Sequence, residues 1–171
     1  AQAAEDERQG PTFPDRPIIS IDAPTTRDVD DAFFIEARPD GGWNLTLALA
    51  CPAFRWPFGG KLDKAVFNRA TSIYLPEATH HMLPEALGTG AYSLLAQKTR
   101  PSLPTECTVG PDGLLAPCEP RVGYARLAAN RCSRDCETAL DGGESPRSPY
   151  LEPPRPALHI PGAPPERPPH K

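Results

Sequence analysis

The 171-residue chain lacks any apolar run of membrane-spanning length, and its polar, acidic first ten residues lack the apolar centre of a secretory signal. A membrane-spanning helix needs about 20 consecutive apolar residues, and a signal peptide needs an apolar stretch behind a basic start. These absences predict a soluble, cytoplasmic protein with no membrane partner. No dinucleotide cofactor is expected either.

Paired cysteines are also missing. The chain has five cysteines, and no two of them form a Cys-x-x-Cys pair. Cys132 and Cys136 are spaced for one face of a helix, but no further Cys or His pair stands nearby to complete the four ligands of zinc. We therefore expect free thiols.

Basic residues are in deficit, with 18 Lys and Arg against 22 Asp and Glu and a net charge of −4. Proteins that bind nucleic acid through its phosphates usually cluster Lys and Arg on one surface. The charge balance therefore argues against a broad phosphate-binding surface. A protein that holds RNA through metal ions and a few stacked bases needs less basic surface.

Proline is in excess, and its distribution predicts the boundaries of the folded part. Ten of the 24 prolines lie from Pro146 onward, and proline both lacks the backbone N–H and fixes φ. We predict a disordered or partly polyproline II tail over 143–171, a folded part over 17–142 and a polar linker over 1–16. The tail is either a ligand for a proline-recognising module or a non-native end left by a truncated or frame-shifted gene.

Within the folded part, the apolar pattern predicts an α+β fold with a mixed, mostly antiparallel sheet and packed helices. Ile18, Ile19 and Ile21 are β-branched and apolar, as in a buried strand. Two apolar runs, 32–37 and 43–50, flank Pro39-Asp40-Gly41-Gly42 and predict a hairpin, since glycine allows the positive φ of a tight turn. Apolar residues at 62–70 have helical spacing.

Two further stretches give weaker signals. Pro111-Asp112-Gly113 is typical of a second hairpin turn, and residues 122–129 fit a strand or a helix equally well. Pro104 lies where a strand is expected, so it would remove a ladder hydrogen bond unless it occupies an edge.

Four carboxylates form the chemical centre of the sequence. Asp22, Asp28, Asp30 and Asp31 occur within ten residues, between two apolar segments. Two like charges about 4 Å apart repel by roughly 4 kcal/mol at an effective dielectric near 20, so converging carboxylates need protons or cations. Oxygen ligands of this kind suit Mg²⁺ or Mn²⁺, and such clusters can cleave phosphodiesters. The alternative is a solvated acidic loop.

The segment IDAPTTRDVDDAFF resembles the metal-binding motif of the ribonuclease II family of exoribonucleases. The likeness continues through LTLALA, GGKLDKAVFNRATSIYLPE and HMLPEALGTGAYSLL, in the family's order and spacing. It covers about Pro17 to Cys118, which corresponds to the front part of the family's catalytic domain.

The resemblance implies a site, a cofactor and a reaction. Asp22, Asp28, Asp30 and Asp31 match the family's catalytic, metal-binding aspartates, with Mg²⁺ the expected ion and Mn²⁺ the alternative. Tyr74 matches the aromatic residue that stacks on the terminal base of the RNA. The implied reaction is 3′-to-5′ hydrolysis of single-stranded RNA to nucleoside 5′-monophosphates. Without the resemblance, Tyr74 would be taken for a core tyrosine.

Some features depart from the family pattern. The strand that ends Ala50-Cys51-Pro52 has a thiol where the family usually has Asp, which leaves the role of that carboxylate open. The family's catalytic domain also continues beyond this length and carries an essential arginine there. On this resemblance the chain is an incomplete catalytic domain with weak or no activity. The alternatives are a non-catalytic RNA-binding or regulatory remnant and a proline-rich interaction protein.

Two adjacent histidines have no counterpart in the resemblance. His80 and His81 follow the Tyr-Leu-Pro segment and could contact RNA or a metal, but a surface pair is the simpler interpretation. Four basic residues near the motifs are candidate phosphate contacts: Lys61, Arg69, Lys98 and Arg100.

Overall fold

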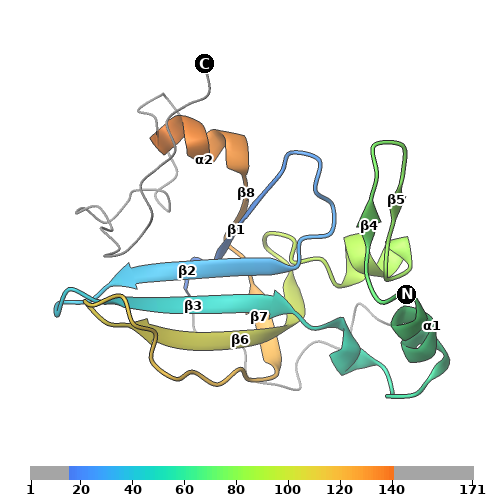
Figure 1. The fold of residues 1–171 in the computed structure, drawn as a ribbon, viewed down its shortest axis with the longest axis horizontal. Coiled ribbons are helices and arrows are strands. Elements are labelled where there is room, and N and C mark those ends of the chain that lie inside the picture. Colours follow the sequence, from blue (N-terminus) through green and yellow to red (C-terminus); the bar gives the residue numbers. More distant parts are fainter. Residues whose placement is uncertain (1–15, 141–171) are drawn as a thin grey trace.

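The structure, a computed structural model, describes residues 16–140. Its centre is a six-stranded sheet with the strand order β7-β6-β3-β2-β1-β8, and a separate two-stranded hairpin, β4-β5, stands beside it (Figure 1). The strands are β1 (Ile19–Asp22), β2 (Asp31–Ala37), β3 (Trp43–Ala50), β4 (Ile73–Tyr74), β5 (Thr79–His80), β6 (Thr99–Val109), β7 (Gly123–Arg126) and β8 (Ala129–Cys132). All neighbours pair antiparallel except β1 and β8, which run parallel. The mixed, mostly antiparallel sheet is therefore confirmed.

The predicted first hairpin is present as β2 and β3, paired from Asp31↔Leu49 to Ala37↔Trp43. Gly41 takes a φ of 85° in the turn, a conformation that a residue with a Cβ rarely adopts. The Asp40 carboxylate accepts the Gly42 N–H at 3.1 Å, which closes the turn. Local sequence alone is enough to fix this connection.

The predicted helix is α1 (Lys61–Arg69), and none of its residues is buried. Its first turn is held by Asp63, whose carboxylate accepts the Trp56 indole N–H at 3.0 Å and the Gly59 N–H at 2.8 Å. The helix ends at Ala70, where φ is 62°. A second short helix, α2 (Ser133–Leu140), follows β8.

The strand β6 explains how Pro104 is accommodated. Pro104 lies opposite Ala48 of β3, and the Pro104 carbonyl accepts the Arg121 N–H on the side away from β3. The backbone polar groups of Pro104 therefore face away from β3, and β7 pairs only with the first residues of β6, from Thr99 to Ser102. The proline lies beyond the paired length on that side, so no ladder hydrogen bond is lost.

The stretch between β6 and α2 differs in part from the expectations. The turn at Gly113 has a φ of 79°, but the returning chain makes one isolated bridge, Val109↔Leu115, rather than a second full hairpin. The ambiguous residues 122–129 contain the strand β7 and reach the start of β8. Cys132 and Cys136 do not share a helix, since Cys132 ends β8, and all five cysteines are free thiols as expected.

The core lies where the sheet meets the segment before β6. Its buried members are Ile18, Val29, Ala32, Ala48, Leu94, Ala125 and Leu127. Asn130 ties this segment to the sheet, because its amide N–H groups donate to Ser20 Oγ and to the Leu94 carbonyl, both at 2.9 Å. Across residues 16–140, no helix has the length and apolar character needed to span a membrane. The expected linker and proline-rich tail lie outside the described residues, apart from Arg16 at the linker's end.

Candidate active site

The carboxylate loop, residues 22–31, runs from the end of β1 to the start of β2 and passes beside the β4-β5 hairpin (Figure 1). Its single buried residue is Val29. The Val29 N–H donates to Ser93 Oγ at 3.0 Å, and the Val29 carbonyl accepts the Leu94 N–H at 2.8 Å. Ser93 Oγ in turn donates to the Arg27 carbonyl at 3.1 Å. These bonds fix the backbone on both sides of Asp28.

The structure brings three of the four predicted aspartates to one hollow. Asp22, Asp28 and Asp30 line a cavity of about 750 Å³, together with Tyr74. Asp31 does not line it. It is exposed at the first position of β2, where its backbone pairs with Leu49. Because the backbone of Asp31 already belongs to the paired strand β2, its side chain lies outside the cavity that the other three aspartates line.

At two points, the carboxylates that line the cavity are not fully stabilised by neighbouring groups. Burial raises the pKa of Asp30 above its ordinary value of 3.8, and the neighbouring carboxylates Asp31 and Asp28 raise it further. One carboxylate oxygen of Asp22, Oδ2, is buried without a hydrogen-bond partner. A buried acceptor without a partner and a carboxyl that resists ionisation both indicate a place where a cation would be stabilised.

Asp28 is the residue at which the loop meets the hairpin. The Tyr74 hydroxyl donates to Asp28 Oδ2 at 2.5 Å, and His81 Nδ1 lies 3.4 Å from the same oxygen. The hydrogen bond to Asp28 raises the pKa of Tyr74, with burial adding to the shift. The Tyr74 residue is still 64% exposed, so the structure shows a surface tyrosine and not a core one.

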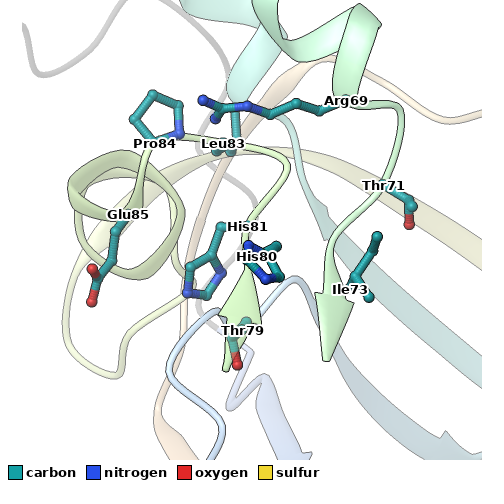
Figure 2. A pocket seen from close by; sticks show the side chains of 9 residues that line it. All are labelled: Arg69, Thr71, Ile73, Thr79, His80, His81, Leu83, Pro84 and Glu85. Carbon is teal, nitrogen blue, oxygen red and sulfur yellow. The ribbon is translucent and has the colours of Figure 1, made fainter. Parts of the chain in front are cut away.

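Two further hollows lie on the hairpin side of the site. One of about 530 Å³ is shown in Figure 2, where His80 and His81 extend from the end of β5 with Arg69 and Glu85 on the two flanks. Another of about 180 Å³ includes Asp28, Asp30, Tyr74 and His81 in its lining. His81 lines all three hollows.

The interpretation of the histidines as a surface pair is right for His80 and wrong for His81. His80 is exposed in β5, whereas the His81 side chain is 16% exposed and contacts Asp28. Successive residues of a strand point to opposite sides, so one histidine of an adjacent pair at a strand end is expected to face inward. The adjacent pair in the sequence therefore predicts one inward-facing histidine, but it does not show which of the two faces the carboxylate loop.

The basic residues near the motifs have different roles. Arg69 lines the hollow of Figure 2 and donates through one guanidinium nitrogen to the Met82 carbonyl at 3.3 Å. Arg100 instead donates to the Ser93 and Gly90 carbonyls, both at 3.1 Å, and burial lowers its pKa. Arg100 therefore supports the chain that carries Ser93.

A divalent cation fits the donor set, although the site is not a closed cage. Within the described part of the chain, no three His, Cys, Asp or Glu side chains already stand around one point as ligands. Asp22, Asp28 and Asp30 nevertheless supply carboxylate oxygens, which are the donors that Mg²⁺ and Mn²⁺ take. The unpartnered oxygen of Asp22 and the raised pKa of Asp30 are the observations that support the fit.

Comparison with known proteins places this chain in a family. The model of the RNB domain matches residues 12–153. The chain belongs to the RNB family. Ribonuclease R of Vibrio parahaemolyticus is 34% identical over 134 residues, which are 78% of this chain and 16% of that protein. Exoribonuclease 2 of Sodalis glossinidius is 41% identical over 99 residues, covering 58% of this chain and 15% of its own length.

Solved structures share the fold of this chain. RNase R of Mycoplasma genitalium, in complex with ribose-methylated single-stranded RNA, matches 88% of this chain and 23% of its own, with a TM-score of 0.75 and 21% identity. Yeast Ssd1, described as a pseudonuclease, matches 88% of this chain and 18% of its own, with a TM-score of 0.68 and 16% identity. The ribonuclease II resemblance found in the motifs is confirmed. The RNB-family chain spans about one sixth of the length of the curated relatives it matches.

Proposed function

We propose that the carboxylate loop belongs to a metal-dependent exoribonuclease site that hydrolyses single-stranded RNA from its 3′ end to nucleoside 5′-monophosphates. The observation that carries the proposal is the hollow of about 750 Å³ that Asp22, Asp28 and Asp30 line together with Tyr74. Family membership supports the reaction type. The carboxylates would hold Mg²⁺, or Mn²⁺ in its place, with Asp31 beside them.

Different residues of the chain would bind the metal ion, support the carboxylate loop and stack on a base of the RNA. A bound divalent ion supplies Lewis acidity to the phosphodiester. Asp22, Asp28 and Asp30 would bind and position that ion. The hydrogen bonds of Val29 with Ser93 and Leu94 keep the carboxylate loop in place. The exposed ring of Tyr74 offers a face on which a base of any identity can stack.

The metal part of the proposal is tested by Mn²⁺ titration of the 171-residue chain, followed by electron paramagnetic resonance. We expect saturable binding that Asp28→Asn and Asp30→Asn each weaken. Asp112→Asn is the matched control, because Asp112 lies on an exposed turn where Asn can still accept the Leu114 N–H. Equal Mn²⁺ binding by the Asp28→Asn, Asp30→Asn and Asp112→Asn chains would refute the metal site.

The hydrolytic part is tested with 5′-labelled single-stranded RNA. The 134 matched residues cover 16% of ribonuclease R of Vibrio parahaemolyticus. We therefore expect the 171-residue chain alone to be slower than a full-length relative by on the order of a hundred- to a thousand-fold, the usual loss when one group that stabilises developing charge is absent. Processive release of mononucleotides at a full-length rate would contradict this expectation.

A second candidate function is RNA binding without hydrolysis. It is favoured by the fold shared with Ssd1, which is described as a pseudonuclease. RNA binding that persists in Asp30→Asn, with no mononucleotide released by the unaltered chain at any Mn²⁺ concentration, would favour this alternative. The remaining candidate, proline-dependent protein interaction, concerns residues outside the described part of the chain.

A further inference from the structure

We propose that His81 is a positioning residue for Asp28. In this role, His81 and Tyr74 together fix the orientation of the carboxylate and hold the β4-β5 hairpin against the carboxylate loop. The part of the inference that concerns metal affinity rests on the proposed metal site. The part that concerns the hairpin does not, because it can be measured without metal.

The first observation is that two side chains converge on one oxygen. Asp28 Oδ2 accepts the Tyr74 hydroxyl at 2.5 Å and lies 3.4 Å from His81 Nδ1. The side chains of Asp28 and His81 are 19% and 16% exposed, so the contact is largely shielded from water. Both contacts therefore act on the same oxygen and constrain the rotation of the Asp28 carboxylate.

The second observation is that the hairpin has little else to hold it. The strands β4 and β5 have two residues each, all four are exposed, and in the described part of the chain they pair only with each other. At the base of the hairpin, the Met82 N–H donates to Ser72 Oγ at 2.9 Å, and the Met82 carbonyl accepts a hydrogen bond from Arg69 at 3.3 Å. The side of the hairpin meets the carboxylate loop at Asp28, through Tyr74 and His81.

The third observation is the place of His81 in the chain. It follows β5 directly and lines all three hollows, and Figure 2 shows it beside His80, whose side chain belongs only to the hollow drawn there. Partners that orient a ligating carboxylate commonly change metal affinity by 10- to 100-fold when removed. His81 is placed to act in that way, and His80 is not.

The first experiment measures Mn²⁺ affinity of the full chain by electron paramagnetic resonance in His81→Ala, His81→Gln and the matched control His80→Ala. We expect a loss of about ten-fold in His81→Ala, a smaller loss in His81→Gln, which keeps an amide donor, and no change in His80→Ala. If His81→Ala weakens the fold itself, His81→Gln against His80→Gln carries the comparison. Equal affinities of the His81 and His80 variants would overturn the metal part of the proposal.

The second experiment measures amide hydrogen exchange of residues 73–81 without metal. We expect faster exchange in His81→Ala than in His80→Ala, most clearly at the Leu75 N–H, which donates to the Ala78 carbonyl, while β2 and β3 amides stay unchanged. Unchanged exchange across the hairpin would overturn the role of His81 in holding it. A wild-type chain that binds no Mn²⁺ but shows the exchange difference would refute the proposed metal site and leave the hairpin contact standing.

Discussion

The six-stranded sheet and the arm beside it, defined as α1 and the β4-β5 hairpin, are built in opposite ways. The sheet buries a continuous apolar cluster in which Ala48 and Leu94 are fully enclosed. The arm buries no residue of α1 and none of β4 or β5. Large aromatic side chains at and before α1 face outward, with Phe58 at 99% and Phe67 at 82% exposure.

This difference teaches where the candidate site gets its rigidity. The aspartates lie on a loop whose Val29 is part of the sheet's core, so their backbone is fixed by hydrophobic burial. Tyr74 lies on the arm, whose position depends on polar contacts such as the one with Asp28. The site thus joins a rigid half to a half that a few side chains hold in place. The exposed phenylalanines at and before α1, Phe58 and Phe67, form apolar surface of the kind that commonly marks an interaction site.

The largest effect should come from the core of the sheet. Replacing the fully buried Leu94 with alanine should lower the free energy of unfolding by about 3 kcal/mol, through lost burial and the cavity left behind. Phe67→Ala in the arm should change it by about 0.5 kcal/mol or less. Urea denaturation followed by circular dichroism measures both. Similar losses in the two variants would show that the arm has a core of its own.

A smaller effect should come from the contact that joins the two regions. Tyr74→Phe removes the hydroxyl that donates to Asp28 and keeps the ring. We expect hairpin amides to exchange about five-fold faster, which corresponds to about 1 kcal/mol of local stability, with β2 and β3 amides unchanged. Tyr92→Phe is the control, since the edge-to-face contact of that ring with Trp56 survives. Equal exchange of the hairpin in Tyr74→Phe and wild type would mean that the hydroxyl contributes nothing to the junction.

An effect that appears only at high pH concerns a thiol inside the sheet. Burial, followed by the neighbouring Cys118, raises the pKa of Cys107 from 9.0 to about 11. A raised pKa stabilises the fold below pH 9.0, and this contribution is lost as pH rises through about 11. The stability advantage of the wild type over Cys107→Ala should therefore narrow between pH 9 and pH 11 in urea titrations. An advantage that stays constant over this range would contradict the shift.

Much of the fold could be predicted from the sequence, because its determinants are local. The turn at Gly41 and the apolar runs beside it predict β2 and β3, and helical spacing predicts α1. The carboxylates were recognisable because four acids stood between two apolar strands. Their separation into three that line a hollow and Asp31 at the margin was not predictable, because it depends on where pairing with Leu49 begins.

Other features had no local signal. The inward turn of His81 depends on which side of β5 meets the carboxylate loop, and residue type alone does not specify this. The role of Arg100 in binding backbone carbonyls depends on a neighbouring segment that the sequence does not place. The parallel pairing of β1 with β8 joins positions about 110 residues apart, as in the bond between Ser20 and Asn130.

That parallel pair has a consequence for the order of folding. The strand β1 leaves the ribosome before β2, β3, β6 and β7, whereas its partner β8 emerges only after them. Closing so long a segment costs conformational entropy and slows folding relative to local hairpins. We therefore expect the β2-β3-β6 meander to form first and β1 to complete its pairing late. Because Asp22 is the last residue of β1, it would be the last aspartate to take its place, and the candidate site would assemble only near the end of folding.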